Sequence, residues 1–174
     1  SAMSHTLFLM RHAKAESHSR VSDINRELAP RGRQQARDAG LELADRGIQL
    51  VLCSSSVRTR QTYEGLFLRG PDGEPVPVQY MEALYLGSAE LIRQRISEIT
   101  DDISSLLVIG HSPGIPNLAS DLAWASAPQE ADRIGCWFPT AAYTEFTIDV
   151  GWSALADSDE GAHLAHVQRP KHAV

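Results

Sequence analysis

The chain has 174 residues, of which 43% are hydrophobic and 22% are charged, a composition typical of a globular protein with one buried core. Its net charge of -6 argues against general binding of nucleic acids, whose phosphate backbones are held by basic surfaces. No apolar stretch approaches the length of a membrane-spanning helix, and the first residues do not resemble a secretory signal. Cys53, in an apolar run, and Cys136, in an expected loop, favour reduced thiols over a disulfide or a metal site. We therefore expect a cytoplasmic protein with neither a membrane nor a nucleic acid as partner.

Apolar and amphipathic segments alternate along most of the chain. Short apolar runs predict strands, at residues 6–10, 49–53, 76–81 and 106–109. Apolar residues at helical spacing predict helices, at residues 30–46, 57–68, 89–100 and 115–124. After residue 139 the period changes to two, which predicts a half-exposed strand at 143–149, a partner strand at 152–155 and an edge strand at 164–168.

Strands that alternate with helices predict an α/β domain whose sheet is covered on both faces. We expect a single domain over residues 4–170, a three-layer αβα sandwich with a mostly parallel sheet and a late antiparallel strand. Residues 1–3 look like a remnant of an expression tag, and residues 171–174 are expected to form a tail.

Basic side chains follow three of the apolar runs. Arg11 and His12 follow the first run, Arg58 the second and His111 the fourth. Because the carboxyl ends of parallel strands lie at one edge of a sheet, where α/β proteins bind ligands, we expect these side chains to meet. Each alone would be an ordinary loop or turn residue. Together they predict a cationic phosphate site, since guanidinium groups hold phosphoryl oxygens through paired donors and imidazole is a good nucleophile toward phosphorus.

Three segments around these residues resemble the motifs of the histidine phosphatase superfamily, whose fold is called phosphoglycerate mutase-like. They are Leu7 to Ala13 with its arginine–histidine pair, Ser54 to Thr62, and Val108 to Gly114. The stretches Asn25 to Ala36 and Pro139 to Ala142 further resemble the SixA-like branch, the phosphohistidine phosphatases. The resemblance runs from about residue 6 to residue 149 and implies this fold and a phosphatase activity that needs neither a metal nor another cofactor.

The resemblance assigns His12 the role of nucleophile, which would carry the phosphoryl group until water removes it. Arg11 and Arg58 would stabilise the charge of the transferred group, and His111 would add a third donor if protonated. His12 must then be neutral, with one ring nitrogen held by a backbone carbonyl. Either Gly110 or Gly32 could supply that carbonyl.

Two further residues have open roles. Arg26 could face the bound phosphate, as an arginine in this loop does in the SixA-like branch, or it could pair at the surface with Glu27 or Asp23. Glu82 is the nearest acidic candidate for a proton donor to the leaving group, although a solvated charge at a strand end fits its position better. Without a positioned acid, phosphohistidine is favoured over unactivated phosphomonoesters, because an alkoxide needs a proton as it departs.

The other histidines are expected to lie outside this chemistry. His5 precedes the first predicted strand, and His18 could line the mouth of the pocket. A late cluster is interpreted as part of a flexible polar tail, namely His163, His166 and His172.

We therefore expect a metal-independent phosphatase that acts on phosphohistidine in a signalling protein, such as a phosphotransfer domain. Two alternatives use the same pocket: a phosphomonoesterase for small phosphate esters, and a non-catalytic module that docks a phosphorylated partner. The short chain leaves little insertion to cover the pocket, which favours a protein substrate over a sequestered metabolite. The two histidines count against a binding module, which would need only arginines.

Overall fold

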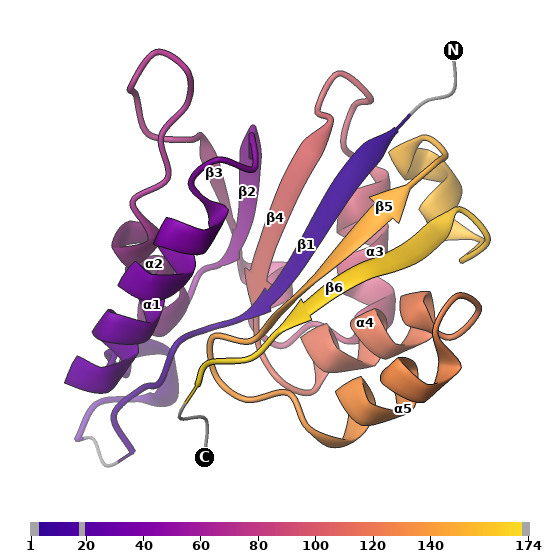
Figure 1. The fold of residues 1–174 in the computed structure, drawn as a ribbon. Coiled ribbons are helices and arrows are strands. Elements are labelled where there is room, and N and C mark those ends of the chain that lie inside the picture. The colour runs from indigo at the N-terminus through magenta and orange to yellow at the C-terminus, as the bar shows by residue number, and fades with distance from the viewer. Residues whose placement is uncertain (1–3, 18–19, 172–174) are drawn as a thin grey trace.

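Residues 4–17 and 20–171, the part of the chain that this computed structural model describes, contain a six-stranded sheet in the order β3-β2-β4-β1-β5-β6 (Figure 1). The strands are β1 His5–Arg11, β2 Leu50–Ser54, β3 Val78–Met81, β4 Ser105–Gly110, β5 Tyr143–Ile148 and β6 Ala162–Gln168. The first four strands of the chain run parallel, whereas β5 pairs antiparallel with both β1 and β6. The expected sheet, mostly parallel with a late antiparallel strand, is confirmed.

Helices cover both faces of this sheet. They are α1 Pro30–Leu43, α2 Val57–Leu66, α3 Ala89–Ser97, α4 Gly114–Ala123 and α5 Pro128–Cys136, with the short 3-10 helices η1 Asp23–Asn25, η2 Glu82–Leu84 and η3 Trp152–Ala156. α1 and α2 lie on one face, and α3, α4 and α5 lie on the other (Figure 1). The three expected layers are therefore present. Within the described residues, no helix is both long and apolar enough to cross a lipid bilayer.

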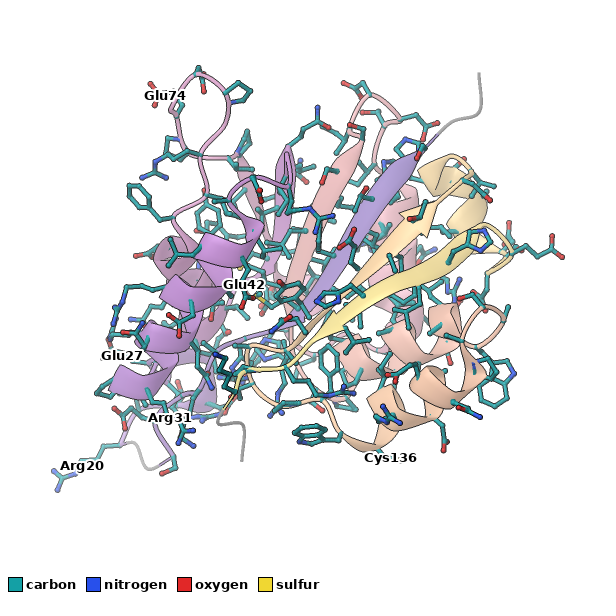
Figure 2. All side chains as sticks on the ribbon, in the orientation of Figure 1. Arg20, Glu27, Arg31, Glu42, Glu74 and Cys136 are labelled. Carbon is teal, nitrogen blue, oxygen red and sulfur yellow. The ribbon has the colours of Figure 1, made fainter. Side chains whose placement is uncertain are left out.

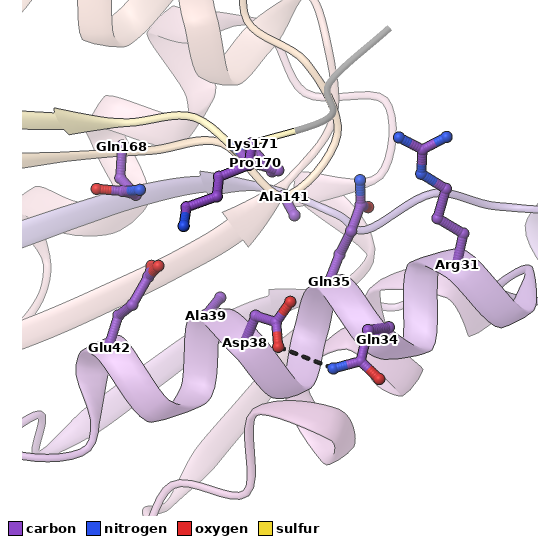
Figure 3. Close-up of a pocket in the computed structure, with 10 residues that line it drawn as sticks. All are labelled: Arg31, Gln34, Gln35, Asp38, Ala39, Glu42, Ala141, Gln168, Pro170 and Lys171. Atoms are coloured by element: carbon purple, nitrogen blue, oxygen red, sulfur yellow. Dashed lines mark hydrogen bonds between the residues drawn. The ribbon is translucent and has the colours of Figure 1, made fainter.

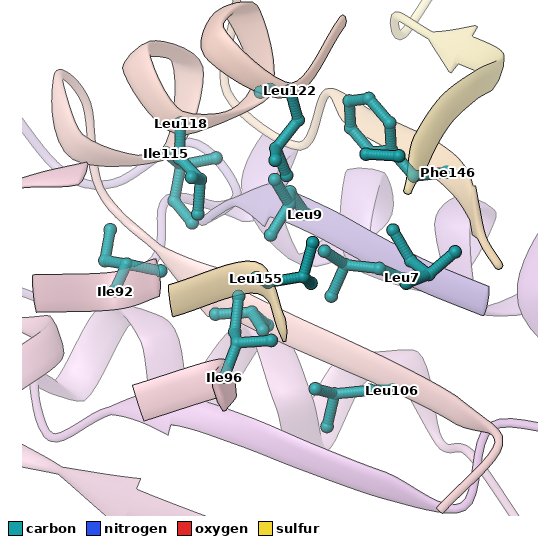
Figure 4. Close-up of a cluster of buried hydrophobic side chains, with 14 of the residues drawn as sticks. Leu7, Leu9, Ile92, Ile96, Leu106, Ile115, Leu118, Leu122, Phe146 and Leu155 are labelled. Carbon is teal, nitrogen blue, oxygen red and sulfur yellow. The ribbon is translucent and has the colours of Figure 1, made fainter. Parts of the chain in front are cut away.

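Alternate side chains of the central strands supply the two halves of the core. Leu7 and Leu9 of β1 pack into the cluster that includes α3, α4 and η3, which Figure 4 shows. Phe8 and Met10 point to the opposite face and pack with Leu43 of α1. Successive strand residues point to opposite faces, so a strand covered on both sides needs an uninterrupted apolar run. This double packing fixes the end of β1, from which Arg11 and His12 emerge.

Residues 152–155 form the 3-10 helix η3, so the prediction of a strand there is wrong. The indole of Trp152 is fully buried, and its Nε1 donates to the carbonyl of Ile103 at 2.7 Å. The backbone N–H of Trp152 donates to Oδ1 of Asp101 at 3.0 Å. These contacts hold η3 next to α3, and the segment does not pair with β5.

Residues 128–136 form α5, a helix that was not expected. Pro128 stands at its first turn, and Ala131 and Ile134 form its buried side, so the signals for a helix were present in the sequence. The prediction that Cys136 lies in a loop is therefore wrong, because it is the last residue of this helix (Figure 2).

The late histidines belong to the sheet, and the prediction that they form a flexible tail is wrong for two of them. His163 pairs with Thr147 of β5, and His166 pairs with Glu145, so both lie on the edge strand β6 with exposed side chains. The backbone pairing with β5 orders this segment. His172 and His18 lie outside the described residues.

Candidate functional site

The structure brings the four basic residues of the strand ends together at one edge of the sheet. β4 lies between β1 and β2 and all three run parallel, so their carboxyl ends are adjacent. Arg11, the last residue of β1, pairs with Gly110, the last residue of β4. His12 and His111 directly follow these two residues in the chain. The ring centroids of His12 and His111 are 5.2 Å apart, and Nη2 of Arg58 lies 3.4 Å from Nδ1 of His111.

His12 is held by its backbone and by its ring. Its backbone N–H donates to the carbonyl of Gly110 at 3.0 Å, and its ring Nδ1 donates to the carbonyl of Ala13 at 2.7 Å. Because a carbonyl only accepts, Nδ1 carries the proton and Nε2 keeps a free lone pair. Ala13 is itself fixed, since its N–H donates to Oγ1 of Thr62 at 3.0 Å. Neither Gly110 nor Gly32 supplies the carbonyl for the ring, so that prediction is wrong; Gly110 already binds the backbone of His12.

Gly32 has a different role, which is to let α1 approach the loop after His12. A Cβ atom at this position would lie 1.9 Å from the carbonyl oxygen of Lys14, so a side chain would displace the backbone there. The same carbonyl accepts the N–H of Ala29 at 3.0 Å. The first turn of α1 therefore packs directly on the segment that positions His12.

Both imidazoles of the site are neutral at pH 7. Burial lowers the pKa of His12 to about 3, and the charges of Arg58 and Arg11 act in the same direction. Burial also lowers the pKa of His111 to about 4, with Arg58 contributing further. Neutral His111 accepts from Arg58 at Nδ1, and its Nε2 donates to Oγ of Ser54 at 2.8 Å. In the free protein, His111 is therefore a hydrogen-bonded neutral group and not a cation.

Arg11 and Arg58 are oriented by backbone carbonyls. Nη1 of Arg11 donates to the carbonyl of Phe138 at 3.0 Å, and Nη1 of Arg58 donates to the carbonyl of Asp23 at 2.7 Å. Nη2 of Arg58 donates to Oδ2 of Asp23 at 3.0 Å. Within the described residues, the Nε atoms of both arginines are buried without a hydrogen-bond partner. A buried donor without an acceptor is costly, so the free protein leaves these two N–H groups unsatisfied.

Arg26 forms the ion pair with Asp23 that was one of its two expected alternatives. Its Nε and Nη2 lie 3.3 and 3.0 Å from Oδ1 of Asp23, and its Nη1 donates to the carbonyl of Glu16 at 2.8 Å. The same carboxylate also binds Arg58, so Asp23 links the two arginines. Arg26 therefore lies at the rim of the site. Glu82, the candidate proton donor, is exposed at the first position of η2.

Asp23 and Tyr85 also belong to the site, and neither was selected from the sequence as a site residue. The hydroxyl of Tyr85 donates to Oδ2 of Asp23 at 2.5 Å, and the Tyr85 ring lies edge-on to His111 with centroids 5.5 Å apart. This hydrogen bond, with those from Arg26 and Arg58, holds the pKa of Asp23 well below its usual range. Asp23 is therefore an ionised carboxylate inside a cluster of arginines.

Among the described residues, hollows lie near this edge of the sheet. A pocket of about 400 Å³ lies between α1 and the end of β6, with Gln35, Glu42 and Lys171 among its lining residues (Figure 3). It includes none of the predicted site residues. A second hollow of about 300 Å³ is lined by Arg11 together with Trp137 at the end of α5. The second hollow therefore leaves space beside the guanidinium group of Arg11.

The remaining titratable candidates lie apart from this chemistry. Cys53 and Cys136 are free thiols, and burial raises the pKa of Cys53 to about 12. His5 is buried as the first residue of β1, and its ring lies between the carbonyls of Val150 and Asp101. In the described ranges, no three His, Cys, Asp or Glu side chains are placed to hold a metal ion.

Acidification should destabilise the protein through His12. Its folded-state pKa of about 3 lies below the value of about 6.5 for an exposed histidine, so its contribution to stability is complete above pH 6.5 and is lost as the pH falls toward 3. Between pH 6.5 and 5, the free energy of unfolding should fall by roughly 1.5 kcal/mol more in the wild type than in His12→Asn. Urea unfolding at each pH measures the difference. An equal fall in both proteins would mean that His12 takes up a proton in the fold.

The chain is similar to known proteins in sequence and in structure. The profile of the histidine phosphatase superfamily (branch 1) matches residues 7–85. An uncharacterized protein of Mycobacterium tuberculosis is 34% identical over 164 residues, which cover 92% of this chain and 100% of that protein. A solved structure of a protein proposed to be the phosphohistidine phosphatase SixA of Nakamurella multipartitia shares 31% identity over 97% of each chain, with a TM-score of 0.83. The protein histidine phosphatase SixA complexed with tungstate shares 24% identity over 93% of this chain and 95% of its own, with a TM-score of 0.72, which supports the fold.

Proposed function

This chain belongs to the histidine phosphatase superfamily as a SixA-like phosphatase, and from that premise we propose that it removes the phosphoryl group of phosphohistidine in a signalling protein. In this proposal His12 carries the phosphoryl group as a covalent intermediate, and no metal ion takes part. The proposed partner is a cytoplasmic phosphotransfer domain.

The observation that carries the proposal is the state of the His12 ring. Its Nδ1–H donates to Ala13, so Nε2 is the atom with a free lone pair. Burial keeps the ring neutral at pH 7, and the positive charges of the neighbouring arginines act in the same direction. A neutral imidazole beside two guanidinium groups can attack phosphorus while the guanidinium groups bind the phosphoryl oxygens.

The reaction takes two displacements at phosphorus. Nε2 of His12 forms a bond to phosphorus while the bond from phosphorus to the substrate's imidazole nitrogen breaks. The leaving imidazole takes that electron pair and departs as a neutral molecule when its other nitrogen carries a proton. Positive charge develops on the ring of His12, where the Nδ1–H donor to Ala13 stabilises it. Water then attacks phosphorus, the bond to Nε2 breaks, and phosphate leaves with the protons of that water.

Charge stabilisation is assigned to the arginines. In phosphoryl transfer the oxygens of the transferred group carry negative charge throughout a loose transition state. Arg11 and Arg58, which emerge beside His12 and His111, would bind those oxygens through their guanidinium groups. His111, neutral in the free protein, would gain a proton only when a phosphoryl dianion raises its pKa, and Arg26 would contact the anion from the rim.

The surroundings of the site favour a nitrogen leaving group over an alkoxide. Glu82 is exposed, and Asp23 is ionised because its hydrogen bonds lower its pKa. The hydrogen bond to Asp23 raises the pKa of Tyr85, which makes its hydroxyl a poor acid. An alkyl phosphate needs a positioned acid, whereas an imidazole that is already protonated does not.

The nucleophile assignment is tested with His12→Ala. Turnover of a phosphohistidine protein should fall by about a thousandfold or more, because the covalent route is lost. A radiolabelled phosphoryl donor such as phosphoramidate should label His12 in the wild type, with the position found by peptide mapping. His166→Ala, which removes an exposed histidine of β6, should keep both the label and the activity. Near wild-type turnover in His12→Ala would contradict the covalent mechanism.

The substrate class is tested through the leaving group. Phosphohistidine and aryl phosphates should react, while sugar phosphates should be slower by about a hundredfold or more, the usual contribution of a positioned acid. Glu82→Gln should leave kcat/KM for phosphohistidine unchanged, as should the matched exposed variant Glu90→Gln. Fast cleavage of sugar phosphates that Glu82→Gln selectively removes would make Glu82 the acid and the protein a small-molecule phosphomonoesterase. Phosphate binding without turnover of any substrate would instead indicate a binding module.

A further inference from the structure

Asp23 is a carboxylate in a site that is otherwise built to attract anions. It is the first residue of η1, in the loop between β1 and α1. Its Oδ2 accepts from Nη2 of Arg58 at 3.0 Å and from the hydroxyl of Tyr85 at 2.5 Å, while its Oδ1 accepts from Arg26 at 3.0 Å. One side chain thus joins three groups from three separate segments at the mouth of the site.

We propose that Asp23 is a positioning residue of the phosphatase, which fixes the guanidinium group of Arg58 beside His12 and holds the ring of Tyr85 edge-on to His111. The proposal rests on the function proposed above, because it assigns Arg58 to the phosphoryl group. Asp23 itself does not contact the reacting atoms in this scheme.

Arg58 is oriented mainly by Asp23. Its side chain is only 7% exposed, and both of its terminal nitrogens donate to Asp23, one to the backbone carbonyl and one to the carboxylate. A pair of donors bound to one residue fixes the plane of a guanidinium group. Its contact with His111 is longer, at 3.4 Å, and its Nε is without a hydrogen-bond partner within the described residues. Without the carboxylate of Asp23, Arg58 would keep the backbone carbonyl of residue 23 but would lose the charged acceptor of Nη2, and with it the second contact that fixes the plane of the guanidinium group.

Tyr85 is also held by Asp23. Its ring lies 5.5 Å from the ring of His111 and 5.9 Å from the guanidinium carbon of Arg58. Its only polar atom on the side chain donates to Asp23. The aromatic ring therefore lies next to two of the predicted phosphate ligands, and its hydroxyl is held by Asp23.

The ion pair between Asp23 and Arg26 is too exposed to contribute much to the stability of the fold. The side chain of Asp23 is 54% exposed and that of Arg26 is 26% exposed. An ion pair between two such side chains contributes little to the free energy of folding, at most about 1 kcal/mol. The ion pair between Asp23 and Arg58 differs, because Arg58 is buried and its charge would lose a partner without the carboxylate. Orientation of a charged group before the reaction, by contrast, acts directly on the transition state.

A double-mutant cycle tests the proposal on the full-length protein. Asp23→Ala should lower kcat/KM for phosphohistidine or an aryl phosphate by about tenfold or more, and Asp23→Asn, which keeps an acceptor for Arg58, should recover most of it. In an Arg58→Ala background, Asp23→Ala should cost less than about twofold, because Asp23 acts through Arg58. Asp38→Asn, at an exposed carboxylate of α1, is the control and should behave like the wild type. A full tenfold loss in the Arg58→Ala background, or no loss in the wild-type background, would overturn the proposal.

Binding of inorganic phosphate, measured by calorimetry, separates this proposal from the proposed function. If Asp23 positions Arg58, Asp23→Ala should bind phosphate more weakly even though a negative charge has been removed. If Asp23 merely repels anions, Asp23→Ala should bind phosphate more tightly, and the proposal fails. A wild type that binds phosphate but cleaves no phosphohistidine and no aryl phosphate would overturn the proposed function, and with it the catalytic part of the role of Asp23.

Discussion

The hydrogen bond from Nδ1 of His12 to the carbonyl of Ala13 decides which ring nitrogen is free, and the chemistry of the site follows from that choice. The bond depends on where the Ala13 peptide lies. Its N–H donates to the hydroxyl of Thr62, which in turn donates to the carbonyl of Arg58 at 2.8 Å. A short chain of contacts thus joins the tautomer of His12 to the helix that carries Arg58. Thr62, in the segment Ser54 to Thr62, therefore helps to position His12 in the segment Leu7 to Ala13.

The site must also hold several positive charges close to a neutral imidazole. The order of the strands brings these groups together, because β4 lies between β1 and β2 and the polar ends of the three strands meet at one buried edge. Burial favours the neutral form of an imidazole, and nearby guanidinium groups favour it as well, so both effects lower the pKa of His12. Asp23 offsets part of the repulsion between the arginines. The buried edge and the carboxylate together allow cations and a nucleophile to share a small space.

Sequence patterns predicted the layers of the fold and the meeting of Arg11, His12, Arg58 and His111. Each of these residues follows an apolar strand, and parallel strands end at the same edge. Contacts that depend on loop geometry could not be predicted in this way. The Ala13 carbonyl lies next to His12 in the chain, yet only the turn of the backbone brings it to the ring.

Asp23 and Tyr85 illustrate the same limit, because a loop must fold back to bring them together. The errors at residues 128–136 and 152–155 have other causes. The signals for α5, a proline at its start and apolar residues three positions apart, were present in the sequence but were not used. At residues 152–155, the burial of one large indole outweighed the alternating pattern. Local sequence patterns therefore predicted most of the regular helices and strands. Tertiary packing determined the loop contacts and the structure of residues 152–155.

The most direct test of the account is the ionisation and tautomer of His12 in the free protein, read from the nitrogen chemical shifts of its ring by NMR. The account predicts that Nδ1 is protonated and Nε2 is not, and that both signals stay unchanged from pH 8 to pH 5, since the pKa lies at about 3. The same histidine in urea-unfolded protein should titrate near 6.5, which provides the reference. An imidazolium at pH 7, or a neutral ring with its proton on Nε2, would contradict the claim that His12 is prepared as the nucleophile.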